Sequence, residues 1–275
     1  MSSLLILLAF NVSTAFQVKE VNEVLKWLPE HEHASVTRKK YVNDQRLAVG
    51  SLLLRRYFVS KYLAMPWHDI QFDRLPGGKP TLACPDGQYL DFNISHDGDW
   101  VVLVSTMTRK LQVGVDCVSI KTLKDPVNTF VDCFQYQLTL SERQTIFNGQ
   151  DEATQLRAFY QIWGCKESYT KAIGEGLAFD LQQISFNNHP TERWIECQHG
   201  NQLQVTWMYH VSDLDEKTAV VICCGDPSAS SLDHRLRDFG HMTRRIGEPY
   251  VSPTDAFTRL TLNDIHQQYL RNTHC

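Results

Sequence analysis

A glutamate stands in a predicted helix at a position where an apolar side chain is expected. Glu167 lies in a helix predicted over 152–173, one turn beyond the aromatic part of its buried stripe. The other members of that stripe are Leu156, Tyr160, Trp163 and Thr170. Burying an unpaired carboxylate costs several kcal/mol, so Glu167 needs either a cation or a raised pKa. Lys171, four residues further on, could supply an ordinary ion pair, and the helix alone does not decide between that pair and a ligand role.

A second carboxylate makes the ligand role more attractive. Asp116 follows the run Leu111–Val115 of a predicted strand, and Gly114 within that run leaves space for a close approach to the backbone. An aspartate and a glutamate from different elements, meeting in a partly dry place, form an oxygen site suited to Mg²⁺. Such a metal keeps waters and takes further ligands from substrate phosphates. The pair Asp116 and Glu167 therefore predicts a magnesium site for phosphate chemistry.

Two further groups of residues could contact phosphate oxygens. His96 belongs to a predicted polar corner over 95–98, where a ring N–H could donate to a phosphate, although a histidine in a turn more often serves only the turn. Lys79 follows a turn at 76–78 and forms, with Arg74, a compact cationic patch. Solvated surface charges are the alternative for both cations.

The elements that carry these residues follow from hydrophobic periodicity and turn signals. Helices are predicted over 18–28, 48–62, 127–134, 141–147 with Ser141 as N-cap, and 152–173. Strands are predicted over 4–8, 89–94, 100–105, 111–117, 184–186, 194–198, 205–210 and 219–224. A second turn is expected at 85–87.

Helices followed by strands occur twice along the chain, and this predicts the fold class. We expect an α+β protein of two similar lobes, each a small and mostly antiparallel sheet packed with helices, related by a pseudo-twofold axis. The lobes would comprise residues 1–112 and 113–225. Residues 226–275 are polar and irregular, and we expect a poorly determined tail there.

Composition excludes some classes of partner and favours a reducing compartment. The 275 residues are 43% hydrophobic and 21% charged with a net charge of −4, which argues against a nucleic-acid partner. The eight cysteines form no CxxC pair, so reduced thiols in the cytosol are the expectation. The apolar run 4–10 has the outline of a signal peptide without its positive n-region, is too short to span a membrane, and suits a buried strand equally well.

Three blocks of the sequence together resemble the signature of the phosphopantetheinyl transferases, and a fourth extends the match. The blocks are Phe92–His96, Val113–Asp116, the segment from Trp163 through Ser168 with Lys171, Gly174, Gly176 and Leu177, and the loop Leu75–Pro80. Their order and spacing both fit, and the resemblance covers roughly residues 40–190. The sequence most resembles the two-lobed, monomeric branch of the family, which has broad specificity.

The resemblance implies an activity and a set of roles. Members of this family move the 4'-phosphopantetheine arm of coenzyme A to a serine of an acyl or peptidyl carrier domain and release adenosine 3',5'-bisphosphate. Asp116 and Glu167 would bind Mg²⁺, and Glu167, directly or through water, would also take the proton of the serine. Lys171 would steady the pyrophosphate in the C-terminal lobe.

The same resemblance implies that the N-terminal lobe binds the adenosine side of the coenzyme. The residues that would bind its phosphates are His96, Arg74 and Lys79, and the residues that would line its nucleotide pocket are Asn93, Ile94 and Ser95. Partners would be coenzyme A and apo carrier domains, with no nucleic acid, no membrane and a monomeric chain. The carriers served, and the balance between fatty-acid synthesis and lysine metabolism, do not follow from the sequence.

Two positions depart from the family pattern. Val118 stands where many bacterial members have an acidic residue, so water would provide the third ligand to the metal. Ser51 stands where a coenzyme-binding arginine is expected, and Arg55 or Arg56 could compensate. Two other functions remain open: a non-catalytic scaffold that binds coenzyme A or a carrier, and a metal-dependent phosphohydrolase acting on coenzyme A derivatives.

Overall fold

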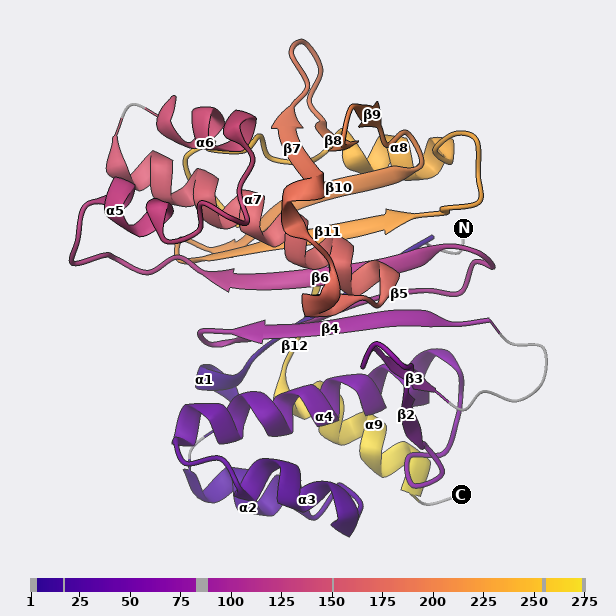
Figure 1. The fold of residues 1–275 in the computed structure, drawn as a ribbon. Coiled ribbons are helices and arrows are strands. Elements are labelled where there is room, and N and C mark those ends of the chain that lie inside the picture. The colour runs from indigo at the N-terminus through magenta and orange to yellow at the C-terminus, as the bar shows by residue number, and fades with distance from the viewer. Residues whose placement is uncertain (1–3, 17, 83–88, 150, 254–255, 274–275) are drawn as a thin grey trace.

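The computed structural model describes residues 4–16, 18–82, 89–149, 151–253 and 256–273 (Figure 1). It has an α+β fold with two lobes, which confirms the predicted fold class. In each lobe one long helix packs on a sheet of three or four strands. None of the helices in the described part of the chain is long and apolar enough to cross a membrane.

The N-terminal lobe is built around a four-stranded sheet in the order β12-β1-β5-β4. Its strands are β1 (Ile6–Asn11), β4 (Asp91–Asp97), β5 (Trp100–Thr106) and β12 (Thr258–Leu260), and β12 runs parallel to β1 while the other pairs are antiparallel. The long helix α4 (Val42–Tyr62) lies against this sheet. Short elements complete the lobe: α1 (Val12–Ala15), α2 (Val18–Leu25), α3 (Glu30–Thr37), β2 (Phe72–Arg74), β3 (Pro80–Leu82) and α9 (Leu262–Thr273).

The C-terminal lobe holds a three-stranded antiparallel sheet in the order β10-β11-β6. Its strands are β6 (Gln112–Ser119), β10 (Trp207–Asp215) and β11 (Thr218–Gly225), and the long helix α7 (Glu152–Ile173) crosses them. Around these lie α5 (Val127–Asp132), α6 (Leu140–Phe147), α8 (His234–Gly240), two short 3₁₀ turns at 176–178 and 181–183, and a small sheet of β7 (Ile184–Asn188), β8 (Ile195–His199) and β9 (Gln202–Leu203).

Helix α7 begins and ends where the sequence predicts, because both of its ends carry local signals. Asp151 caps the first turn by accepting a hydrogen bond from the Thr154 N–H. Gly174 ends the helix in the left-handed region at φ 79°, which glycine adopts without steric cost. The faces of both sheets that point away from the long helices meet in a shared apolar cluster, which includes Val102 and Val115.

The two lobes are joined by a row of hydrogen bonds that we call the β4–β6 ladder. Side-chain oxygens of alternate β4 residues accept from backbone N–H groups of β6, and each bond spans 22 positions in the sequence. The four bonds are Asp91 to Val113 (2.7 Å), Asn93 to Val115 (3.0 Å), Ser95 to Cys117 (3.2 Å) and Asp97 to Ser119 (2.8 Å). Residues two apart on a strand share one face, so the polar alternation of β4 supplies acceptors for the edge of β6.

Two expectations from the sequence are corrected by the structure, and a third cannot be compared with it. Residues 95–97 continue strand β4, and the turn lies instead at Gly98, whose φ is 58°. The N-cap of α6 is Thr139, which forms a capping box with Glu142, in place of Ser141. The turn expected at 85–87 lies outside the described residues.

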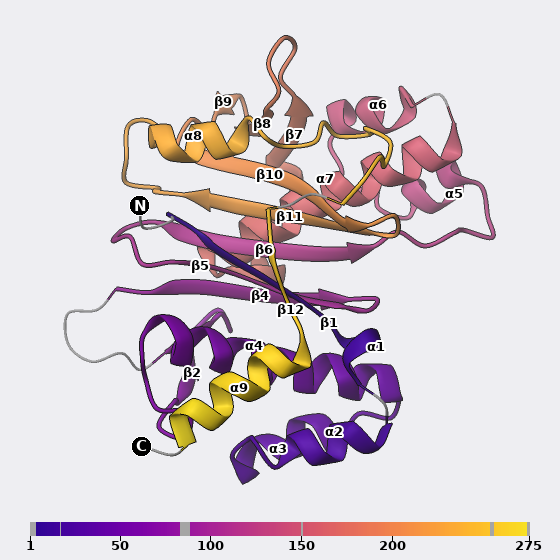
Figure 2. The ribbon, with the colours of Figure 1, turned by 180° about the vertical axis from the view of Figure 1, so that it is seen from behind.

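The described part of the C-terminal segment forms regular elements, where the sequence suggested a poorly determined tail from residue 226. It contains α8, β12 and α9, and in the view of Figure 2 β12 runs down in front of the sheets to α9, which packs beside α4. Ile265 of α9 is buried in the core of the N-terminal lobe. The division at residue 112 stays a prediction.

Candidate active site

The predicted carboxylate on β6 lies at the junction of the lobes and is paired with a lysine of α7. Asp116 is buried, and its Oδ1 accepts from the Lys171 Nζ at 2.5 Å. Ser95 of β4 donates from its Oγ to the same oxygen at 3.3 Å and accepts from the Lys171 Nζ at 3.2 Å. Strands β4 and β6 and helix α7 thus meet at Ser95, Asp116 and Lys171, which we call the ionic cluster.

Glu167 lies one helical turn before Lys171 and is half-buried. Burial raises the pKa of this carboxyl, the negative charge of Asp116 raises it further, and Lys171 opposes both. The ammonium of Lys171 is directed at Asp116, so the simple pair between Glu167 and Lys171 does not describe this geometry. The negative charge of Asp116 beside Glu167 makes this a place where added positive charge is favourable.

Lys166, the residue before Glu167 on α7, carries a fully buried charge. Lys166 forms an ion pair with the buried Glu142 at 3.0 Å and donates to the carbonyls of Leu181 and Ile184 at 2.7 and 2.5 Å. Burial lowers the pKa of Lys166 and raises that of Glu142, while the partner opposes each shift. The charge of Glu167 is costly as the sequence suggests, because burial raises its pKa, and Lys166 is a second, fully buried charge that the sequence pattern did not indicate.

Gly114 explains how Asp116 and α7 come together. A Cβ at this position would lie 1.9 Å from the Ser168 carbonyl oxygen and 2.6 Å from the Ala172 nitrogen. The sequence suggested a close approach to the backbone at Gly114, and the approaching group is the helix itself. This contact holds Asp116 within reach of Lys171, 55 residues away.

Glu167 faces a pocket of about 260 Å³ in the C-terminal lobe. Its walls are Tyr136, Gln137, Trp163, Gly176, Phe179, Asp180 and Leu181. The aromatic rings make one side of the pocket apolar, while Glu167 provides a carboxylate at its edge. A substrate group that enters this pocket can therefore meet a base of raised pKa.

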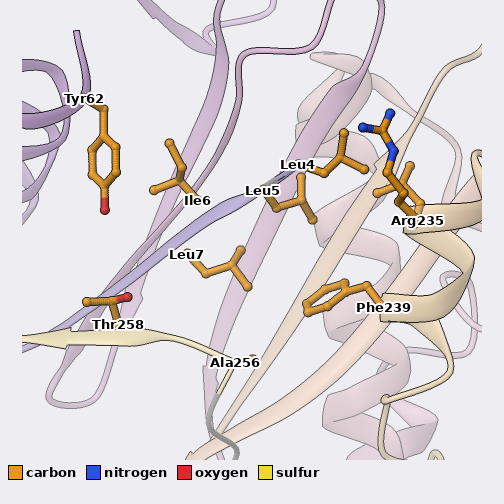
Figure 3. A pocket seen from close by; sticks show the side chains of 10 residues that line it. Leu4, Leu5, Ile6, Leu7, Tyr62, Arg235, Phe239, Ala256 and Thr258 are labelled. Atoms are coloured by element: carbon orange, nitrogen blue, oxygen red, sulfur yellow. The ribbon is translucent and has the colours of Figure 1, made fainter. Parts of the chain in front are cut away.

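A second pocket, of about 490 Å³, lies elsewhere and is drawn in Figure 3. Leucines at the start of the chain form one side, Phe239 and Arg235 of α8 another, and Thr258 of β12 a third. The Arg235 guanidinium is paired with Asp233 at 2.8 Å. None of the described residues that line this pocket is a carboxylate, so it lacks the donor set found at Asp116 and Glu167.

His96 is the exposed residue of β4, next to the ionic cluster. Partial burial of its ring lowers the pKa of His96, and the positive charges of Lys171 and Lys39 lower it further. Lys39, just after α3, is a candidate residue that our sequence reasoning missed. The run of basic residues at 38–40 was the available signal.

The residues expected to line a nucleotide pocket divide into two kinds. Asn93 and Ser95 are buried, and their side chains are engaged in the β4–β6 ladder. Ile94 is half-buried and contacts the core of the N-terminal lobe. Asn93 and Ser95 therefore hold the two lobes in register at the point where Asp116 is placed.

Arg74, at the end of β2, and Lys79, in the 75–79 loop that follows, have different surroundings. Arg74 is exposed and donates from Nη1 to the Gly78 carbonyl at 2.9 Å. Lys79 is buried, and its ammonium donates to Asp91 Oδ2 at 2.7 Å and to the carbonyls of Val113 and Ala172, each at 3.0 Å. An ammonium has three N–H groups, so this arrangement leaves Lys79 no donor for a phosphate.

The arginines that could replace a coenzyme-binding residue near Ser51 are both engaged. Arg56 is fully buried, where it pairs with Glu32 at 3.1 Å and donates to the Trp67 carbonyl at 2.8 Å. Arg55 pairs with the same glutamate at 2.6 Å. Arg56 is a core residue, so it does not compensate for Ser51.

The donor set fits a hard divalent cation that is only partly enclosed by protein. Within the described ranges no three His, Cys, Asp or Glu side chains gather as metal ligands. Val118, where an acid would complete the shell, is buried and lies 3.5 Å from the position of a Cβ at Gly164 of α7. Asp116 and Glu167 offer oxygen ligands, and water and phosphate oxygens would have to supply the rest.

Comparisons with known proteins show the family of the chain. A model of the N-terminal region of 4'-phosphopantetheinyl transferases matches residues 16–108, and a model of the 4'-phosphopantetheinyl transferase superfamily matches residues 112–224. The chain belongs to the 4'-phosphopantetheinyl transferase superfamily. Members of this superfamily are enzymes that transfer phosphopantetheine from coenzyme A to a serine of a carrier protein, and that is the activity of this chain.

Individual relatives give the degree of similarity. The chain is 32% identical over 237 residues to the human L-aminoadipate-semialdehyde dehydrogenase-phosphopantetheinyl transferase. The aligned region covers 82% of this chain and 73% of the relative. The mouse protein of the same name is 30% identical over 253 residues, or 88% and 78% of the two chains. A phosphopantetheinyl transferase of Thraustochytrium is 30% identical over 201 residues, or 71% and 69%.

Proposed function

We propose that the transfer takes place at Asp116, Glu167 and Lys171, with Mg²⁺ held by the two carboxylates. The observation that supports this is the ion pair between Asp116 and Lys171 at the lobe junction, with Glu167 one turn away at the edge of a pocket. Mg²⁺ bound there would neutralise charge on the phosphate oxygens of coenzyme A. Val118 leaves the remaining ligands to water and the pyrophosphate.

Lys171 is suited to hold the pyrophosphate. Its side chain is partly exposed, and its ammonium has two partners, Asp116 and Ser95, so a third N–H can point to a phosphate oxygen. Since Ser95 is fixed by the β4–β6 ladder, the lysine is anchored from both lobes. Its role would be to orient the pyrophosphate and stabilise its charge in the transition state.

Glu167 is the group placed to accept the serine proton, directly or through water. Its raised pKa makes it a better proton acceptor than an ordinary carboxylate. As the serine oxygen forms a bond to the phosphorus that bears the pantetheine arm, that phosphorus loses its bond to the bridging oxygen. The electron pair leaves with adenosine 3',5'-bisphosphate, and the serine proton goes to Glu167.

The phosphates on the adenosine side would meet the exposed cations of the N-terminal lobe. His96 and Lys39 lie near one another beside Lys171, and Arg74 is exposed at the end of β2. A bound phosphate would favour the protonated form of His96, opposite to the effect of the lysines. Lys79 is omitted from this set, because its donors are used inside the protein.

The partners we propose are acyl and peptidyl carrier domains. The relatives' printed name supports an aminoadipate-semialdehyde dehydrogenase as one carrier, and hence a role in lysine metabolism. A carrier of fatty-acid synthesis is a second candidate, because the same serine chemistry would serve it. We further propose a monomer in the cytosol, since one chain carries both lobes of the site.

The decisive experiment incubates the protein with coenzyme A, Mg²⁺ and an apo carrier domain, and weighs the intact carrier by mass spectrometry. We expect one phosphopantetheine adduct, lost when the carrier serine is changed to alanine and reduced when the metal is chelated. Cleavage of coenzyme A without a carrier would favour the phosphohydrolase. Binding of coenzyme A without an adduct on any of several carriers would favour the scaffold.

A further inference from the structure

Lys79 connects the N-terminal lobe to the end of the helix that carries the proposed catalytic residues. It starts from the loop before β3, and its ammonium reaches the carbonyl of Ala172 in the last turn of α7. The last four carbonyls of a helix have no hydrogen-bond partner within the helix, and the Ala172 carbonyl is one of them. A cation at this end also interacts favourably with the helix dipole.

The backbone of the same loop touches α7 as well. A Cβ at Gly77 would lie 1.5 Å from the carbonyl oxygen of Gly174, the residue that caps α7. The loop therefore rests directly on the helix end, with Lys79 as its polar contact. Lys171 immediately precedes Ala172, so anything that moves this turn also moves the proposed pyrophosphate ligand.

We infer that Lys79 is a positioning residue, which caps α7 from the opposite lobe and thereby sets the place of Lys171 relative to Asp116. The inference rests on the proposed roles of Lys171 and Asp116. It gives the 75–79 loop a function different from phosphate binding: the loop transmits the position of the N-terminal lobe to the catalytic helix.

A simpler explanation is that Lys79 only neutralises Asp91. Burial raises the pKa of Asp91, and Lys79 opposes that shift, so the carboxylate does need the ammonium. Asp91 also accepts from the Val113 N–H and forms the first bond of the β4–β6 ladder. This explanation accounts for one of the three hydrogen bonds of Lys79 and leaves the two carbonyl contacts without a consequence.

The test separates neutralisation from positioning with a pair of variants. Lys79→Met removes the ammonium and leaves a buried charge at Asp91, which destabilises the lobe. Lys79→Met combined with Asp91→Asn removes both charges, and the asparagine oxygen can still accept from Val113. Asp91→Asn alone and Lys61→Met, at an exposed position of α4, are the controls.

We expect the double variant to regain most of the thermal stability that Lys79→Met loses. Its kcat for carrier modification should nevertheless fall about 10- to 100-fold with the carrier KM nearly unchanged, because Lys171 is misplaced. Hydrogen exchange at Gly174 and Glu175, whose N–H groups both bond to the Thr170 carbonyl, should become faster in the double variant and in neither control.

Recovery of wild-type kcat together with stability in the double variant would reduce Lys79 to a neutralising residue and overturn the inference. Weaker binding of coenzyme A, measured by calorimetry, with unchanged kcat and unchanged exchange would overturn it in favour of a direct phosphate contact. If the wild-type protein modifies no carrier, the proposed site fails on its own. The exchange measurement then still decides whether Lys79 caps α7.

Discussion

Changing Gly114 to alanine should disable the site while the protein still folds. The added Cβ would lie 1.9 Å from the Ser168 carbonyl oxygen, and an ordinary contact begins near 3.4 Å. Strand β6 and α7 must therefore separate by about 1.5 Å at this point. Overpacking of this kind costs about 1–3 kcal/mol, and a misplacement of about 1 Å in a catalytic site can cost about 100-fold in rate.

The measurements are kcat for carrier modification and the free energy of unfolding in urea. Gly240→Ala is the matched control, because its Cβ would lie 2.9 Å from the Met208 side chain, in the core and away from the ionic cluster. A flexible methionine can yield where a helix backbone cannot, so the control should keep its kcat. Wild-type kcat in Gly114→Ala, with the Asp116 to Lys171 ion pair intact in its crystal structure, would refute the reasoning.

Three further predictions concern the charges of α7. Glu167→Gln should lose most of its turnover while the fold persists, since the amide cannot accept the serine proton. For the same reason, turnover of the wild type should fall as pH decreases through the raised pKa of Glu167. Because that pKa is higher in the folded state, ionisation of Glu167 destabilises the protein: Glu167→Gln should be the more stable protein above the raised pKa, and the difference should vanish below the ordinary value of 4.5. Lys166→Met should destabilise the protein by about 3–5 kcal/mol, because it leaves Glu142 buried without a cation.

Each of these predictions has an outcome that contradicts it. Near wild-type turnover of Glu167→Gln with Mg²⁺ would make the residue structural, and a Gln variant that is less stable at high pH would contradict the sign of its pKa shift. For Lys166, the test is the combination with Glu142→Gln. That combination should restore part of the stability measured by urea unfolding, and no recovery would mean that the ion pair is not the cause.

Local patterns in the sequence were enough to find α7 and its two ends. Asp151 and Gly174 are signals that act within one turn, so they keep their meaning in the folded protein. Glu167 was found because it interrupts an apolar stripe. Asp116 was found because we expected it to end a strand after Gly114, whereas in the structure it lies inside β6. Their convergence rests on Gly114, whose neighbour in space lies more than 50 residues away, and only the structure identifies that neighbour.

The surroundings of Lys79 could not be predicted for a physical reason. Two of its three acceptors are backbone carbonyls, and a carbonyl leaves no mark on residue type. The polar residues of 95–97 were assigned to a corner because such residues favour turns. Ser95 and Asp97 instead accept hydrogen bonds from the edge of β6, a strand whose need for acceptors cannot be seen from β4 alone.

The parallel pairing of β12 with β1 has a consequence for synthesis of the chain. Strand β1 is made near the start and waits about 250 residues for its neighbour, since Leu8 pairs with Thr258. Until then one edge of the first sheet is open, and the face of α4 that receives α9 is uncovered. The N-terminal lobe therefore cannot be completed until the segment of the C-terminal lobe has been synthesised.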